Sequence, residues 1–169
     1  RITTIDASES NTIAPARLAA ASINGSAACH TRSRLRSDRC PHQIIAIDGP
    51  AASGKSSVAR ELAKRLGFVY VNSGAMYRAM TWLVLERGIS PRNAPAIEQL
   101  AENAAITCGL RDEASFMHLD GIDPEPFLRE DRVNENVSLV SSVPRVREIL
   151  VDHLRRYAEK DDLVMEGRD

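Results

Sequence analysis

Short apolar runs alternate with stretches of helical periodicity along most of the chain. The apolar runs are rich in branched and aromatic residues, as in buried strands, and lie at 44–47, 68–71 and 163–165. Elsewhere apolar residues recur every three to four positions, which predicts helices over about 56–66, 75–87, 97–104, 133–139 and 144–160. Residues 105–119 alternate enough to predict a small hairpin. Strands that alternate with helices predict an α/β fold, with a parallel sheet flanked by helices.

Residues 1–43 lack this pattern. They are rich in Ala, Ser and Thr, hold few large apolar residues, and carry six Arg against three acidic residues. Such a segment buries too little apolar area to offset its chain entropy, so we predict a disordered leader. Its Arg- and Ser-rich, acid-poor composition is also typical of an organelle transit peptide, and an incidental leader is at least as good an explanation.

The composition of the whole chain excludes some functions. The 169 residues hold 22 Lys and Arg against 23 Asp and Glu, a net charge of −1, and aromatic residues make up only 4%. This balance argues against a nucleic-acid or membrane binder that works by bulk charge. There is no apolar run near 18 residues, so no membrane span is expected. Three cysteines without framework spacing indicate reduced thiols and a cytoplasmic protein, or an organellar one if the leader is a transit peptide.

The turn after the first apolar run carries the clearest chemical signal. Residues 49–56 read G-P-A-A-S-G-K-S, which fits the phosphate-loop pattern G-x-x-x-x-G-K-[ST] at every fixed position. In this motif backbone N–H groups and a helix N-terminus cradle a polyphosphate. Lys55 is expected to contact the β- and γ-phosphates, and the Ser56 hydroxyl to coordinate Mg²⁺. The predicted ATP phosphate-binding residues are Gly49, Pro50, Ala51, Ala52, Ser53, Gly54, Lys55, Ser56 and Ser57.

A phosphate loop alone does not separate a GTPase, a motor ATPase and a small-molecule kinase. The chain has no N-K-x-D guanine signature and is short for a motor, so a nucleoside monophosphate kinase is favoured. Two alternatives stay open. One is a kinase of another small metabolite such as shikimate, and the other is a non-enzymatic ATP-binding module.

Four further segments carry a family resemblance. They read I-D-G-P at 47–50, N-S-G-A-M-Y-R at 72–78, P-R-V-R-E at 144–148 and E-G-R-D at 166–169. In this order and spacing they resemble bacterial-type cytidylate kinase over residues 44–169, whereas residues 1–43 match nothing in the family. The resemblance implies transfer of the γ-phosphoryl group of ATP to CMP or dCMP, with Mg²⁺. It also implies a P-loop NTPase-type core over 44–76 and 161–169, with a monophosphate-binding insertion over about 77–160.

The resemblance also implies the acceptor site. Arg78 and Arg168 would hold the acceptor phosphate, for which the forked guanidinium of Arg is well suited. The residues that would line the nucleoside are Ser73, Ser138, Arg147 and Asp169. A carboxylate at 169 can accept from cytosine N4, and a guanidinium at 147 can donate to N3 or O2. Lys55 and Arg168 are the predicted catalytic residues, and Glu166 is expected to act on Mg²⁺ through water.

The family's lid arginines and its last two core strands would follow Asp169. The resemblance therefore implies an incomplete chain, truncated at its C-terminus, with an uncovered sheet edge and weak or no turnover by itself. The complete protein is expected to be a monomer that binds ATP and CMP or dCMP, but neither nucleic acid nor membrane.

Overall fold

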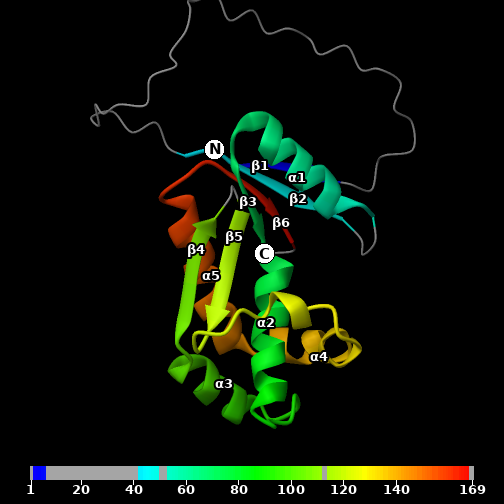
Figure 1. The fold of residues 1–169 in the computed structure, drawn as a ribbon, viewed down its shortest axis with the longest axis vertical. Coiled ribbons are helices and arrows are strands. Elements are labelled where there is room, and N and C mark those ends of the chain that lie inside the picture. The colour runs from blue at the N-terminus through cyan, green and yellow to red at the C-terminus, as the bar shows by residue number, and fades with distance from the viewer. Residues whose placement is uncertain (1, 7–41, 50–52, 112–113, 168–169) are drawn as a thin grey trace, which may run out of the picture.

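The structure is a computed structural model that describes residues 2–6, 42–49, 53–111 and 114–167 (Figure 1). Within these residues the chain forms one six-stranded sheet. Its strands, in spatial order, are β1 (Ile2–Asp6), β2 (Ile44–Asp48), β6 (Leu163–Glu166), β3 (Val69–Asn72), β5 (Ala114–Leu119) and β4 (Ile106–Arg111). All neighbours are parallel except β4 and β5, which form the predicted hairpin. The predicted α/β fold with a mostly parallel sheet is confirmed.

The register of the three central strands brings their carboxyl ends together. Glu166 of β6 pairs with Ile47 of β2 on one side and with Asn72 of β3 on the other. The chain segments that leave these strands therefore begin at one edge of the sheet. In parallel α/β sheets this edge is where ligands bind.

The prediction of a disordered leader over residues 1–43 is wrong for Ile2–Asp6. These residues form β1, which pairs in parallel with β2 from Ile2 opposite Ile44 to Asp6 opposite Asp48. Residues 2–5 read I-T-T-I and are all β-branched, which favours an extended backbone. A five-residue strand stabilised by pairing with residues about 40 positions away leaves little periodic signal in the sequence. β1 lies next to β2 at one edge of the sheet, and residues 7–41 lie outside the described residues.

The helix that follows the first central strand packs through its small residues. α1 (Lys55–Leu66) buries Ala59 and Ala63 against Ile47, Tyr70 and Val164 of the sheet. Leu62 also packs against this cluster. The other two large apolar residues of the helix, Val58 and Leu66, lie away from it. Val58 is 56% exposed and Leu66 45% exposed. The helix is where the pattern places it, but alanines allow a closer approach to the sheet than the larger side chains would.

The lower half of the molecule in Figure 1 is built around one central helix. α2 (Ser73–Glu86) continues directly from β3 and is enclosed by α3 (Ala94–Asn103), α4 (Asp131–Ser141), α5 (Pro144–Ala158) and the β4–β5 hairpin. Nine of its side chains are buried, and the Trp82 ring stacks on Phe127 of the short 3-10 helix Glu125–Phe127. These elements fall within the predicted insertion over about 77–160. Among the described residues, the pair Tyr70 with Ala114 joins the hairpin to the central sheet.

No helix in the described part of the chain combines the length and the apolar character needed to cross a membrane.

Candidate active site

The turn after β2 leads into a helix whose first turn is open to a ligand. Gly54 lies at the N-terminus of α1 with φ 81°, a left-handed conformation that favours glycine, and its carbonyl accepts from the N–H groups of Ser57 and Val58. Among the described residues no side chain caps this end of the helix. The positive end of the α1 dipole therefore faces the turn, an arrangement that suits an anion, as the phosphate-loop pattern predicts.

The turn itself is described at both ends. At its start the N–H of Gly49 donates to Asp48 Oδ1 over 2.7 Å, and at its end Ser53 is followed by Gly54 and Lys55. Pro50, Ala51 and Ala52 lie outside the described residues. Ser57 is exposed on α1. The phosphate-binding role of all these residues stays a prediction.

One large cavity joins this turn to the lower half of the molecule. It has a volume of about 850 Å³ and is lined by the turn, the end of β6, the start of α2, and residues of α4 and α5. Its lining includes the predicted residues Gly49, Lys55, Ser56, Ser73, Arg78, Ser138, Arg147 and Glu166. Arg168 and Asp169 follow the end of β6 but lie outside the described residues. Residues as far apart in sequence as Gly49 and Gly167 thus line one cavity.

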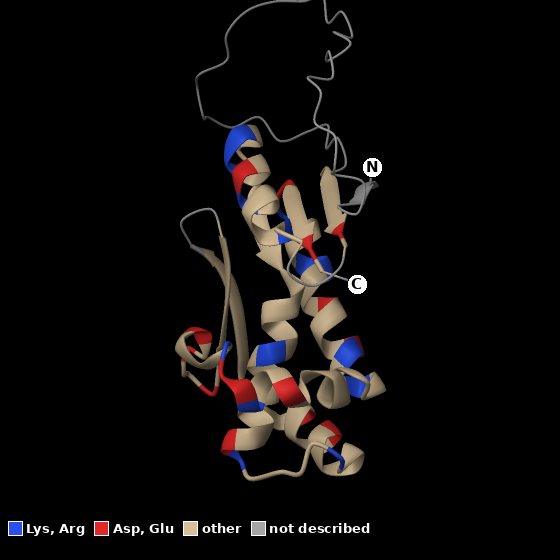
Figure 2. Cartoon of the chain, turned by 90° about the vertical axis from the view of Figure 1, so that its right-hand side faces the viewer, with Lys and Arg blue, Asp and Glu red and all other residues tan. Residues whose placement is uncertain are grey.

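The two arginines of the P-R-V-R-E segment differ in their surroundings. Arg147 lines the cavity, whereas Arg145 pairs with Glu102 of α3 and Glu148 of α5 outside it. Figure 2 shows both signs of charge on the helices of the lower half, so in this view no surface of a single sign dominates. The basic residues relevant to the candidate site are those that line the cavity, such as Lys55, Arg78 and Arg147.

Sequence reasoning missed two polar residues beside Arg78. The Nε of Arg78 donates to Asn134 Oδ1 over 3.3 Å, and Asn134 Nδ2 donates to the carbonyl of Arg129. Asn134 and Arg129 both line the cavity. They stand more than 50 positions from Arg78, and no motif connects them to it. Only the packing of α4 against α2 brings them together.

Glu166 is the most buried carboxylate at the site, with 5% exposure. Its Oε1 accepts from Ser56 Oγ over 2.8 Å and from the Tyr70 hydroxyl over 2.9 Å. Its Oε2 is buried and has no hydrogen-bond partner among the described residues. A carboxylate oxygen and a hydroxyl are hard donors that suit Mg²⁺, so Ser56 and Glu166 fit the expected metal. Burial raises the pKa of Tyr70, and its hydrogen bond to Glu166 raises that pKa further, so this hydroxyl keeps its proton at neutral pH.

These features are those of a kinase-type P-loop protein: a strand, a turn with the phosphate-loop pattern and a helix at the carboxyl edge of a parallel sheet, next to a cavity lined in part by basic side chains. The family model for cytidylate kinase matches residues 45–169. The chain therefore belongs to the cytidylate kinase family.

Curated relatives agree with this assignment. A cytidylate kinase of Caldanaerobacter subterraneus is 48% identical over 125 residues, which are 74% of this chain and 54% of that protein. One from Streptococcus thermophilus is 41% identical over 126 residues, 74% of this chain and 56% of the relative. A bifunctional pantoate ligase/cytidylate kinase of Synechococcus is 43% identical over 127 residues, 75% of this chain and 26% of the relative. The chain thus spans about half the length of the cytidylate kinases it matches.

Proposed function

We propose that the protein transfers the γ-phosphoryl group of ATP to CMP or dCMP, which gives ADP and CDP or dCDP. The observation that carries this proposal is that Lys55, Ser56, Arg78 and Arg147 all line one cavity. A bond forms between an acceptor phosphate oxygen and Pγ, while the bond from Pγ to the β–γ bridging oxygen breaks. Membership of the cytidylate kinase family supports the same reaction.

On the donor side, the N–H groups of the turn and of the first turn of α1 bind the ATP phosphates. Lys55 offsets the charge of the β- and γ-phosphates and remains near the transferring group. No covalent intermediate on the protein is required, because positioning and charge stabilisation account for the rate in this class of reaction.

On the acceptor side, Arg78 and Arg168 hold the monophosphate. Asn134 orients Arg78 by accepting from its Nε, which leaves the terminal guanidinium nitrogens for the phosphate. Arg147 donates to cytosine N3 or O2, Asp169 accepts from N4, and Ser73 and Ser138 line the nucleoside. Uracil reverses the hydrogen-bonding character at N3 and at the 4-position, so these groups would be left unpaired against it.

Mg²⁺ would be held by the Ser56 hydroxyl and, through water, by Glu166. When bound, it would neutralise charge on the β- and γ-phosphates. The Ser56 proton already points to Glu166, so the lone pairs of that hydroxyl are available to the metal.

The test compares acceptors side by side. ADP formation is followed with ATP and CMP, dCMP, UMP, AMP or shikimate, and binding of the same acceptors is measured by calorimetry. The binding arm is needed because we expect turnover by this chain alone to be weak. We expect CMP and dCMP to bind at least about tenfold more tightly than UMP or AMP.

Three results would overturn the proposal. A preference for UMP or AMP would contradict the cytosine assignment, and transfer to shikimate would indicate a kinase of another metabolite. Binding of ATP without binding of any monophosphate would indicate a non-enzymatic module. Strong turnover by the 169-residue chain would contradict only the expectation that it is incomplete. The cytoplasmic location and the monomeric state stay predictions from the sequence.

A further inference from the structure

Two hydroxyl groups from different elements meet on one carboxylate oxygen. Ser56 Oγ, at the start of α1, and the Tyr70 hydroxyl, on β3, both bond to Glu166 Oε1 at 2.8 and 2.9 Å. In both bonds the hydroxyl is the donor and the carboxylate oxygen the acceptor. With Oε1 occupied twice, Oε2 is the oxygen that remains available to another group.

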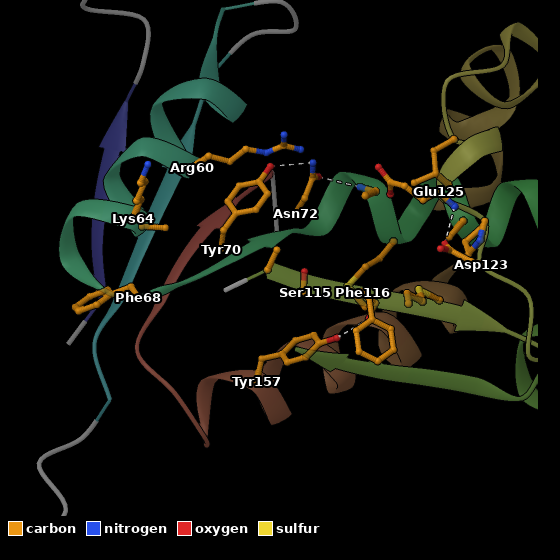
Figure 3. A pocket seen from close by; sticks show the side chains of 18 residues that line it. Arg60, Lys64, Phe68, Tyr70, Asn72, Ser115, Phe116, Asp123, Glu125 and Tyr157 are labelled. Atoms are coloured by element: carbon orange, nitrogen blue, oxygen red, sulfur yellow. Dashed lines mark hydrogen bonds between the residues drawn. The ribbon is translucent and has the colours of Figure 1, made fainter. Parts of the chain in front are cut away.

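The direction of the Tyr70 proton is fixed by Asn72. The Oδ1 of Asn72 accepts from the Ala75 N–H over 2.9 Å and so caps α2. The opposite side of this amide, Nδ2, therefore faces Tyr70 and donates to its hydroxyl oxygen over 3.2 Å. Figure 3 shows both bonds and the side chains that form them. Because the tyrosine oxygen accepts from Asn72, its own proton is directed to Glu166.

The tyrosine ring has little freedom to move. Tyr70 is 7% exposed and packs with Ile47 and Val164 in the cluster beneath α1. The guanidinium carbon of Arg60 stands 5.2 Å from the centre of the ring, over its face. The packing of the ring thus holds the Tyr70 hydroxyl in a fixed position beside Glu166.

We propose that Tyr70 is a positioning residue that orients the Glu166 carboxylate for a metal-bound water, with Asn72 setting the direction of the Tyr70 hydroxyl. This inference rests on the proposed function. Without the bond from Tyr70, Oε1 would keep only its bond from Ser56, and the direction of the free oxygen Oε2 would be held less firmly. Groups that orient metal-binding side chains in this way typically change metal affinity or activity by about 10- to 100-fold when they are removed.

The test is the variant Tyr70→Phe, which removes the hydroxyl and keeps the ring. ATP binding is measured by calorimetry in the presence of Mg²⁺ and again with a chelator. We expect the variant to bind ATP with Mg²⁺ about tenfold more weakly than the parent, and metal-free ATP within about twofold of the parent. CMP binding should also change by less than about twofold, because Tyr70 lies outside the acceptor side of the cavity.

Tyr157→Phe is the matched control. Its hydroxyl is also partly buried and donates to the carbonyls of Gly109 and Phe116, away from Glu166. This control should leave ATP binding unchanged with and without Mg²⁺. The proposal would be overturned if Tyr70→Phe lost ATP affinity equally with and without Mg²⁺, or lost none.

If Tyr70→Phe does not fold, Asn72→Ser decides the question. Serine can still cap α2 but is too short to reach the tyrosine hydroxyl. If Asn72→Ser lowers the affinity for ATP only when Mg²⁺ is present, the result supports the proposal. An equal loss of affinity with and without Mg²⁺, or no loss, overturns it. Failure of the parent chain to bind CMP would count against the proposed function and would leave this comparison of ATP affinities interpretable.

Discussion

Ser73 and Gly167 approach so closely that no side chain fits between them. A Cβ placed on Gly167 would lie 1.7 Å from Ser73 Oγ, and Gly167 also adopts a φ of 144°. The first residue of α2 is thereby packed directly on the segment that leaves β6. Both residues line the cavity, so this contact helps to fix its donor and acceptor sides relative to each other.

Gly167→Ala is expected to lower the free energy of unfolding by about 2 to 4 kcal/mol, through the overlap with Ser73 and the strained backbone. Thermal and urea unfolding measure the change. Gly121→Ala is the control, because Gly121 has a φ of 79° but no atom near the added methyl group, and we expect it to cost about 1 kcal/mol. Adding Ser73→Gly to Gly167→Ala should recover part of the loss. Equal costs for the two alanine variants would contradict the steric explanation.

Lys55→Ala should weaken ATP binding by about 10- to 100-fold, since it removes a charged donor from the triphosphate. Calorimetry with ATP and Mg²⁺ measures this. Lys64→Ala removes an exposed lysine further along α1 that does not line the large cavity, and its affinity for ATP should equal that of the parent. A Lys55→Ala variant that bound ATP as tightly as the parent would contradict the phosphate-loop assignment.

Arg147→Ala is expected to weaken CMP binding by about tenfold or more and to reduce the preference for CMP over UMP, while ATP binding stays unchanged. Arg145→Ala provides the comparison, because Arg145 stands two residues away on α5 and only joins exposed ion pairs with Glu102 and Glu148. Competition between the nucleotides in a binding assay measures both effects. If the two variants bound CMP alike, Arg147 would have no special place in base recognition.

The stability of the chain should depend on the protonation of His153 of α5. Burial lowers the pKa of His153 from its ordinary value of 6.5, and nearby Arg156 lowers it further. As the pH falls, the unfolded chain therefore takes up this proton first. The contribution of neutral His153 to stability is complete above about pH 6.5 and is lost as the pH falls toward the lower pKa of the folded state. Urea unfolding between about pH 7.5 and 5.5 should show a shallower decline in His153→Gln, and an unchanged decline would contradict the pKa shift.

The sequence predicted the elements well because each depends on local pattern. The apolar runs identified β2, β3 and β6, and within the described part of the chain the periodicity identified α1 to α5 within a few residues. The 3-10 helix Glu125–Phe127 was not predicted. β1 was missed because its strand character comes from pairing with β2, which is distant in sequence. The periodicity located α1 but did not show that its alanines, Ala59 and Ala63, would be its fully buried residues.

The candidate site was predictable only as far as its motifs extend. The G-P-A-A-S-G-K-S and N-S-G-A-M-Y-R segments indicated Lys55, Ser56 and Arg78 directly. The contacts that orient these side chains come from residues without a motif, such as Asn134 beside Arg78 and Tyr70 beside Glu166. These contacts depend on how the helices and strands pack and on how individual side chains, such as the Asn72 amide, are oriented. The periodicity of the sequence carries no information on either.

Opposite charges face each other across a second cavity, between α1 and the hairpin. The cavity has a volume of about 490 Å³, with Arg60 and Lys64 on one wall and Asp123 and Glu125 on the other (Figure 3). All four residues are exposed, so their attraction across the gap is open to screening by dissolved ions. Added salt should therefore loosen the association of these two walls.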